Sequence, residues 1–143
     1  MKILTGIESS TAALNAERLR LEVISQNIAN AHVTNTPEGG PYKRMQVVFE
    51  SALAKQQNTD ANGNLKPGAV QIARVEEDSS PTKLVYAPSH PDARQDGYVE
   101  LPNVNIHREM VDMIAASRAY EANMTAIKFA KNMAIETLSI GKG

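Results

Sequence analysis

Three histidines, His32, His90 and His107, are the side chains best suited to acid–base chemistry in this chain of 143 residues. One of them belongs to the run Ser89-His90-Pro91-Asp92, which brings together the three residue types of a serine hydrolase triad. A triad needs its three groups to converge from a rigid scaffold, and neighbours on a proline-flanked loop cannot generally align them. We therefore interpret the run as a turn and predict no catalytic residue.

No pattern for a metal or cofactor is complete. The segment from Asp60 to Asn64 begins like a calcium loop, but Leu65 and Gln71 occupy the positions where an EF-hand needs Gly and Glu. The absence of cysteine excludes disulfides and thiolate zinc sites. The 15 Lys and Arg against 16 Asp and Glu give a net charge of -1, which provides no cationic field for a phosphate backbone. The sequence predicts no metal, no cofactor, no nucleic acid and no small-molecule substrate.

Proline and glycine divide the chain into three parts. All seven Pro and five of the eight Gly fall between positions 37 and 102. This distribution predicts two helical ends around a turn-rich middle. We expect a mainly α fold with a β-containing middle, in which residues 1–34 and 104–143 pair as a coiled coil and residues 35–103 form a small, partly open β domain.

Both ends carry a heptad pattern, with apolar residues that step alternately by four and three. A C-terminal helix over 105–139, capped by Asn103 or Asn105 and stopped at Gly141, would be on the order of 50 Å long. We expect the polar stretch of Glu17, Arg18, Arg20 and Glu22 to be solvated. The two patterns contribute the following candidate subunit-interface residues: Ile7, Leu14, Leu21, Ile24, Ile28, Met110, Met113, Tyr120, Met124, Ile127 and Leu138.

The middle part has strand signals of moderate length. Alternation around Met45–Phe49 and Val70–Ala73, and short β-prone runs at 84–86 and 98–101, predict four strands. Asn62-Gly63 predicts a hairpin turn between the first two. Residues 50–83 are the least diagnostic stretch.

The two heptad patterns could pack on each other as a simple hairpin of helices. With only 4% aromatic residues and no Trp, however, the chain has few bulky anchors for a compact core. Two long seams would then leave apolar surface uncovered in an isolated monomer. We expect other subunits to cover it.

The N-terminal run from Ser9 to Ala31 resembles the terminal signature of the axial proteins of the bacterial flagellum, the rod and hook family. Gly39–Arg44 and the stretch from Ala87 through Asn105 are similar to the proximal rod members of that family. The run Glu109–Asn123 continues the resemblance, which thus covers nearly the whole chain.

This resemblance implies a structural subunit of the basal-body proximal rod, without enzymatic activity, that forms part of a hollow driveshaft for motility. The implied partners are other proximal and distal rod subunits, copies of itself, the rod-to-ring adaptor at the base, and in transit the flagellar type III export apparatus. The implied location is the periplasmic span of the basal body, reached without a cleaved signal peptide. Asn27 and Asn30 match a family signature and are assigned to the helix exit toward the outer domain.

Two other classes stay open at this point. A coiled-coil adaptor or export chaperone of a secretion apparatus would use the same seams to bind one partner in a discrete complex. A small hydrolase would use His90, and its turnover would be lost in His90→Ala.

Overall fold

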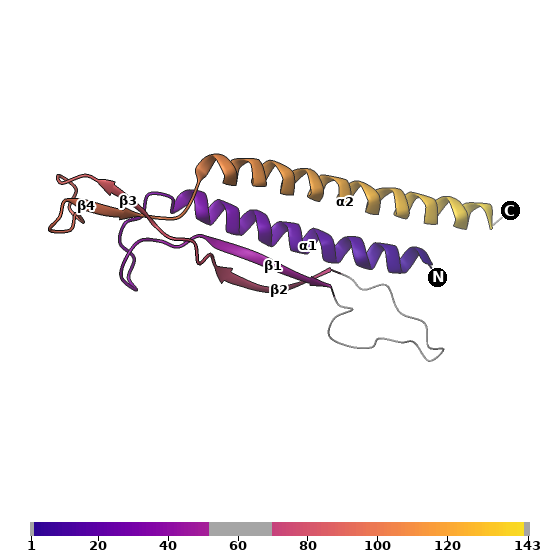
Figure 1. Ribbon diagram of the computed structural model, residues 1–143. Coiled ribbons are helices and arrows are strands. Elements are labelled where there is room, and N and C mark those ends of the chain that lie inside the picture. Colours follow the sequence, from indigo (N-terminus) through magenta and orange to yellow (C-terminus); the bar gives the residue numbers. More distant parts are fainter. Residues whose placement is uncertain (1, 52–69, 142–143) are drawn as a thin grey trace.

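The computed structural model of the chain describes residues 2–51 and 70–141. The elements in chain order are α1 (Lys2–Ala29), β1 (Met45–Ser51), β2 (Val70–Glu77), β3 (Lys83–Tyr86), β4 (Tyr98–Leu101) and α2 (Ile106–Ile140) (Figure 1). Two long terminal helices and, between them in the chain, two small antiparallel sheets confirm the predicted helical ends and β-containing middle. The expected turn at Asn62-Gly63 and the Asp60 segment lie outside the described residues.

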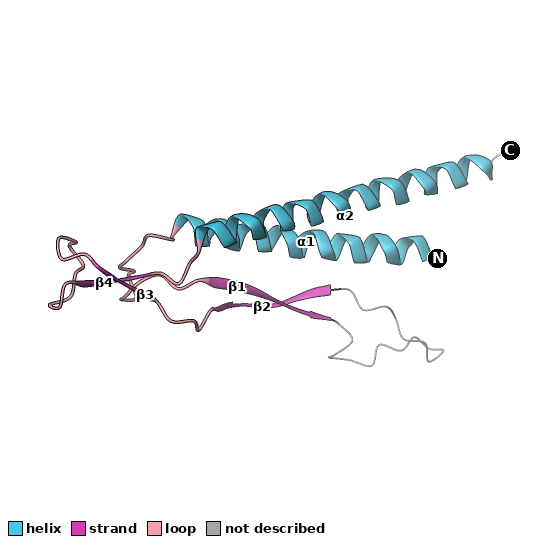
Figure 2. Cartoon of the chain, turned by 45° about the horizontal axis from the view of Figure 1, so that its top comes forward, coloured by secondary structure: helices cyan, strands magenta, loops and turns pink. Residues whose placement is uncertain are grey.

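The two helices run side by side in opposite directions (Figures 1 and 2). Near the end of α1, Arg20 lies 3.9 Å from Asp112 in the first turns of α2. Near the start of α1, Ile7 lines a groove together with Ile127. Between them Ala16 and Ala116 are buried, and such small side chains let two helix backbones approach closely. Coiled-coil packing of the pair stays a prediction.

The buried stripe of α1 differs from the predicted one. The buried residues of α1 are Ala16, Val23, Ile24 and Asn27, of which only Ile24 belongs to the predicted set. Arg20 lies on this stripe, four residues after Ala16, and Glu17 lies at its border, with its Oε2 atom buried 3.8 Å from Arg20. The side chains of Arg18 and Glu22 are 69% and 59% exposed, as expected. Those of Glu17 and Arg20 are 19% and 35% exposed, because the face that α2 covers is rotated toward them.

The start of α2 follows the sequence prediction. The Asn105 side chain caps the helix by accepting a hydrogen bond from the Arg108 N–H at 3.3 Å. At the other end the Gly141 N–H donates to the Thr137 carbonyl. Within the described residues, no helix is long and apolar enough to cross a membrane.

The strands form two separate antiparallel pairs. β1 pairs with β2 from Met45 opposite Glu77 to Ser51 opposite Val70, with a shift in register between Val48 and Phe49. This pair lies alongside α1 (Figures 1 and 2). β3 pairs with β4, and in both views this hairpin projects beyond the start of α2, at the end opposite the termini.

Gly97, just before β4, has a left-handed backbone with φ of 77°. A Cβ atom at this position would lie 2.8 Å from Cε2 of Tyr86, because the ring of Tyr86 packs directly on the glycine. The same ring meets Tyr98 edge-on at 5.3 Å between centroids. Gly97 thus both turns the chain and seats the aromatic pair.

Replacement of this glycine should loosen the β3–β4 hairpin. Gly97→Ala adds the cost of a left-handed alanine, about 1 to 2 kcal/mol, to the clash with Tyr86. In the purified chain the amide of Ala87, which donates to the Gly97 carbonyl at 3.0 Å, should exchange its hydrogen about tenfold faster or more. The matched control is Gly39→Ala, where φ is 91° but nothing lies within 4 Å. Equal Ala87 exchange in both variants would contradict the packing of Tyr86 on Gly97.

Candidate functional site

The predicted interface residues occupy three environments. Ile24 is buried, and Met110 and Leu138 are 53% and 70% exposed. The half-buried residues are Ile7, Leu14, Leu21, Ile28, Met113, Tyr120, Met124 and Ile127. Most of these side chains are therefore only partly covered by the packing of α1 on α2. Contact with other subunits stays a prediction for all of them.

The outward side of α2 is unusually apolar for a surface. Val111 and Ile114 are 66% and 63% exposed in the first half of the helix. Further exposed large apolar residues lie toward the C-terminal end of the helix, where Met133 also lines the groove against α1: Phe129, Met133, Ile135, Leu138 and Ile140. Exposed apolar side chains in this number indicate an interaction site.

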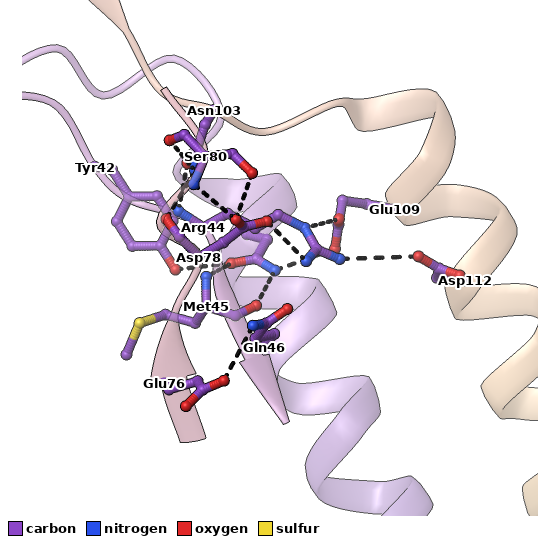
Figure 3. Close-up of polar contacts among 11 residues, drawn as sticks. Tyr42, Arg44, Met45, Gln46, Glu76, Asp78, Ser80, Asn103, Glu109 and Asp112 are labelled. Carbon is purple, nitrogen blue, oxygen red and sulfur yellow. Dashed lines mark hydrogen bonds and ion pairs between the residues drawn. The ribbon is translucent and has the colours of Figure 1, made fainter. Parts of the chain in front are cut away.

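A polar cluster with two fully buried members joins α1, α2 and β1 where the chain leaves the first helix (Figure 3). We call it the polar joint; it consists of Asn27, Tyr42, Arg44, Asp78, Asn103, Glu109 and Asp112.

Asn27 is fully buried near the end of α1, and its amide is completely paired. Its Nδ2 donates to the Met45 carbonyl at 2.8 Å and to Glu109 Oε2 at 3.1 Å. Its Oδ1 accepts from the Met45 N–H at 2.9 Å and from the Tyr42 hydroxyl at 3.0 Å. The Asn27 side chain thus links the backbone at the start of β1 to Glu109 on α2.

Glu109 lies on α2 and is also fully buried. Its Oε1 accepts from Arg44 Nε at 2.7 Å, so that its charge is balanced by a hydrogen-bonded guanidinium. Arg44 also lies 3.5 Å from Asp78 and 3.9 Å from Asp112. Glu109 was expected at the start of the C-terminal helix within a family motif, and in the structure its bonds to Asn27 and Arg44 place it at the centre of the joint.

Asn103 secures the segment that enters α2. Its Oδ1 accepts from the Arg44 N–H at 2.7 Å, and its Nδ2 donates to the carbonyls of Asp78 and Ser80, each at 3.1 Å. This role replaces the alternative in which Asn103 caps α2. The residues before β1, after β2 and before α2 are thereby held at one point.

Electrostatics follow from this packing. Burial by itself lowers the pKa of Arg44, but the hydrogen bond and charge of Glu109, followed by Asp78 and Asp112, hold that pKa above its ordinary value. Burial, and next the charge of Glu109, raise the pKa of Tyr42. The hydroxyl of Ser80 and then its N–H lower the pKa of Asp78.

The His90 segment forms the predicted turn. The His90 N–H donates to the Ala87 carbonyl, and His90 Nδ1 accepts from the Asp92 N–H at 3.1 Å. The Asp92 carboxylate accepts a hydrogen bond from Thr34 at 2.6 Å. Contacts among the described residues do not connect Ser89 to His90 as a nucleophile and its base. Across residues 2–51 and 70–141, which the structure describes, no three potential metal ligands lie together.

Asn27 was singled out from the sequence, but its bonds to Tyr42 and Glu109, and the bond between Arg44 and Glu109, were missed. These polar residues give no periodic signal, because they lie on α1, in the segment before β1 and on α2, which meet only in the fold. The one signal in the sequence was the run Tyr42-Lys43-Arg44 directly before a predicted strand. This run belongs to the stretch that resembles the family, but the resemblance does not say which residues it contacts.

Two family descriptions match the ends of the chain. Residues 7–35 match the family described as flagella basal body rod protein. Residues 95–140 match the one described as flagellar basal body rod FlgEFG protein C-terminal. The two matches include both helices of the joint.

Full-length relatives carry one name. The chain is 44% identical to flagellar basal-body rod protein FlgC of Borreliella burgdorferi, with all of both chains covered. It is 39% identical to the FlgC of Salmonella typhimurium over 99% of this chain and 100% of that one. It is 38% identical to the FlgC of Bacillus subtilis over 96% and 97% of the two chains.

Removal of the Asn27 amide should destabilise the joint strongly. Asn27→Ala leaves the Tyr42 hydroxyl, the Met45 backbone and one oxygen of Glu109 without this partner, at a cost of about 3 kcal/mol in the free energy of unfolding. Asn30→Ala is the matched control, because among the described residues the Asn30 Nδ2 bonds only the Gln26 carbonyl in the last turn of α1. Denaturant unfolding of the purified chains measures both. Similar losses in the two variants would contradict a special role of Asn27.

The raised pKa of Tyr42 predicts alkaline sensitivity. Above the ordinary value of 10.0, the unfolded chain loses the Tyr42 proton while the folded chain still holds it. The free energy of unfolding should therefore fall as the pH rises through this range and be unaffected below it. Tyr42→Phe should lower stability near neutral pH through the lost hydrogen bond to Asn27, but should flatten the alkaline decline. Denaturation midpoints across the range measure this, and an unchanged decline in the variant would contradict it.

Proposed function

This chain belongs to the FlgC family of flagellar basal-body rod proteins and is a structural subunit of the rod; we propose that it polymerises with its neighbours through the terminal helices α1 and α2. It is not an enzyme, so the hydrolase hypothesis is dropped. The hypothesis of an adaptor or export chaperone is not supported either, because the full-length relatives are rod proteins.

The observation that carries the proposal is the uncovered apolar side of α2. Val111 and Ile114 project from the helix pair where the chain's own elements leave them more than half exposed. Burial of a side chain of this size is worth about 1.5 to 3 kcal/mol. Repeated along a helix of 35 residues, this gain favours helix-to-helix contact with other subunits.

The contacts would be heterologous, with the outer side of α2 on one subunit against a different surface of the next. Such contacts do not close in pairs and generate a helical array. A tube of interlocked helix pairs is a hollow driveshaft that transmits torque through many small contacts. In this arrangement, residues 1–34 and 104–143 form the inner domain as a coiled coil, and residues 35–103 form the outer domain.

The finer partners and the location also belong to the proposal. We place the subunit in the proximal rod, across the periplasmic span, between the rod-to-ring adaptor and the distal rod subunits. Copies of the same chain lie beside it. It reaches this place through the flagellar type III export apparatus.

A charge on the outer side of α2 should block assembly without unfolding the chain. Val111→Asp places a carboxylate at a position that is 66% exposed in the single chain, so its own stability should change by less than about 0.5 kcal/mol. In an assembled rod the same carboxylate would be buried without a partner, which costs several kcal/mol. Swimming through soft agar and electron microscopy of isolated basal bodies measure the effect.

The matched control is Val111→Leu, which keeps the position apolar and should support swimming. The purified Val111→Asp chain should show wild-type circular dichroism, which separates failed assembly from failed folding. Normal rods and swimming in Val111→Asp would overturn the assignment of this helix face.

A further inference from the structure

The β3–β4 hairpin exposes several large apolar side chains. Strand pairing places Leu84 opposite Glu100 and Tyr86 opposite Tyr98, so these side chains share a face. Leu84, Tyr86 and Tyr98 are 57%, 65% and 42% exposed. On the other face Val99 is 2% exposed and its strand partner Val85 is 43% exposed. We call Leu84, Tyr86 and Tyr98 the tyrosine face.

The tyrosine face is preorganised. The ring of Tyr86 is seated on Gly97 and meets Tyr98 at an interplanar angle of 65°. Aromatic side chains held in this way lose little conformational entropy on binding, which is why they dominate the energetics of interfaces. In the part of the chain that the structure describes, neither phenolic oxygen has a hydrogen-bond partner, so both are available to a ligand.

The position of the hairpin limits what can cover it. A two-stranded hairpin is marginally stable in water by itself and needs packing on an open face. This one projects past the start of α2, at the opposite end of the long molecule from both termini (Figures 1 and 2). In the head-to-tail array proposed above, the next subunit along the long axis meets the hairpin with the end that carries its termini.

We propose that the tyrosine face binds the C-terminal end of the α2-type helix of the rod-family subunit that follows along the axis. The inference rests on the proposed assembly through terminal helices and adds an axial contact to it. It gives the two ends of the subunit complementary roles.

The helix end has the features that such a face would select. Lys131, Ile135 and Leu138 are spaced by four and three residues and so form one stripe of α2. Ile135 and Leu138 are 53% and 70% exposed. The Lys131 ammonium has no ion-pair partner among the described residues and can lie over a tyrosine ring.

Charge and family membership agree with this pairing. Residues 83–101 carry two basic and three acidic side chains, whereas residues 128–140 carry two lysines and one glutamate. α2 extends past the beginning of α1, so its last turns are accessible (Figure 1). Residues 95–140 match a C-terminal description shared by several rod proteins, so a helix end of this type exists on neighbouring axial subunits.

Photocrosslinking in assembled basal bodies tests the contact. Tyr86→p-benzoylphenylalanine places a photoreactive ring on the tyrosine face, and Val85→p-benzoylphenylalanine is the matched control on the opposite face of the same strand. After irradiation, mass spectrometry of the crosslinked peptides identifies the partner segment. The expected product joins Tyr86 to the last three turns of a C-terminal helix in a rod-family subunit, with at least fivefold less of it from Val85.

The outcomes separate the two proposals. Crosslinks from Tyr86 to any other segment, equal yields from Val85, or no crosslink in intact basal bodies would overturn the axial contact and leave assembly through α1 and α2 standing. Absence of the wild-type chain from purified basal bodies would instead overturn the proposed function. If the Tyr86 variant is not incorporated, Leu84→p-benzoylphenylalanine, on the same face, decides by the same product.

Discussion

The carboxylate of Glu109 is completely withdrawn from solvent, and the chain must supply it with a cation and with donors. Arg44 Nε at 2.7 Å provides the cation, and the Asn27 amide at 3.1 Å provides the second donor. A buried charge deprived of its partner costs several kcal/mol, so these contacts must form together. This requirement fixes which residue of α1 faces which residue of α2, and it fixes where β1 begins.

The rest of the subunit is organised around this constraint. Near the joint the chain is tied by side chains that bond backbone groups, as Asn103 does for three segments at once. Far from it the helix pair is held by small apolar contacts, and a groove of about 250 Å³ opens between Gly6 on α1 and Ala126 and Ala130 on α2. At one end of the helix pair, polar contacts fix how α1 and α2 are aligned. At the other end, the apolar groove is open to contact with neighbouring subunits.

Periodicity predicted the elements well and their partners poorly. The two helices, the capping Asn105, the stop at Gly141 and the four strands follow from local patterns, because turn chemistry and apolar spacing act over a few residues. The buried face of α1 was predicted only in part from the heptad positions. Asn27 and Arg20 are polar and were not expected on this face, because their partners Glu109 and Asp112 come from α2. Contacts between residues that lie 65 or 82 positions apart leave no trace in a local pattern.

The location of the polar joint has a mechanical consequence. If α1 slid along α2 by a single turn, about 5.4 Å, the Asn27 amide would leave Glu109 and the strand backbone at the same moment. The polar joint therefore resists sliding of α1 along α2 through a few side chains only. A twisting load on the helix pair would be borne first by a handful of short polar contacts, and only then by the softer apolar packing further along.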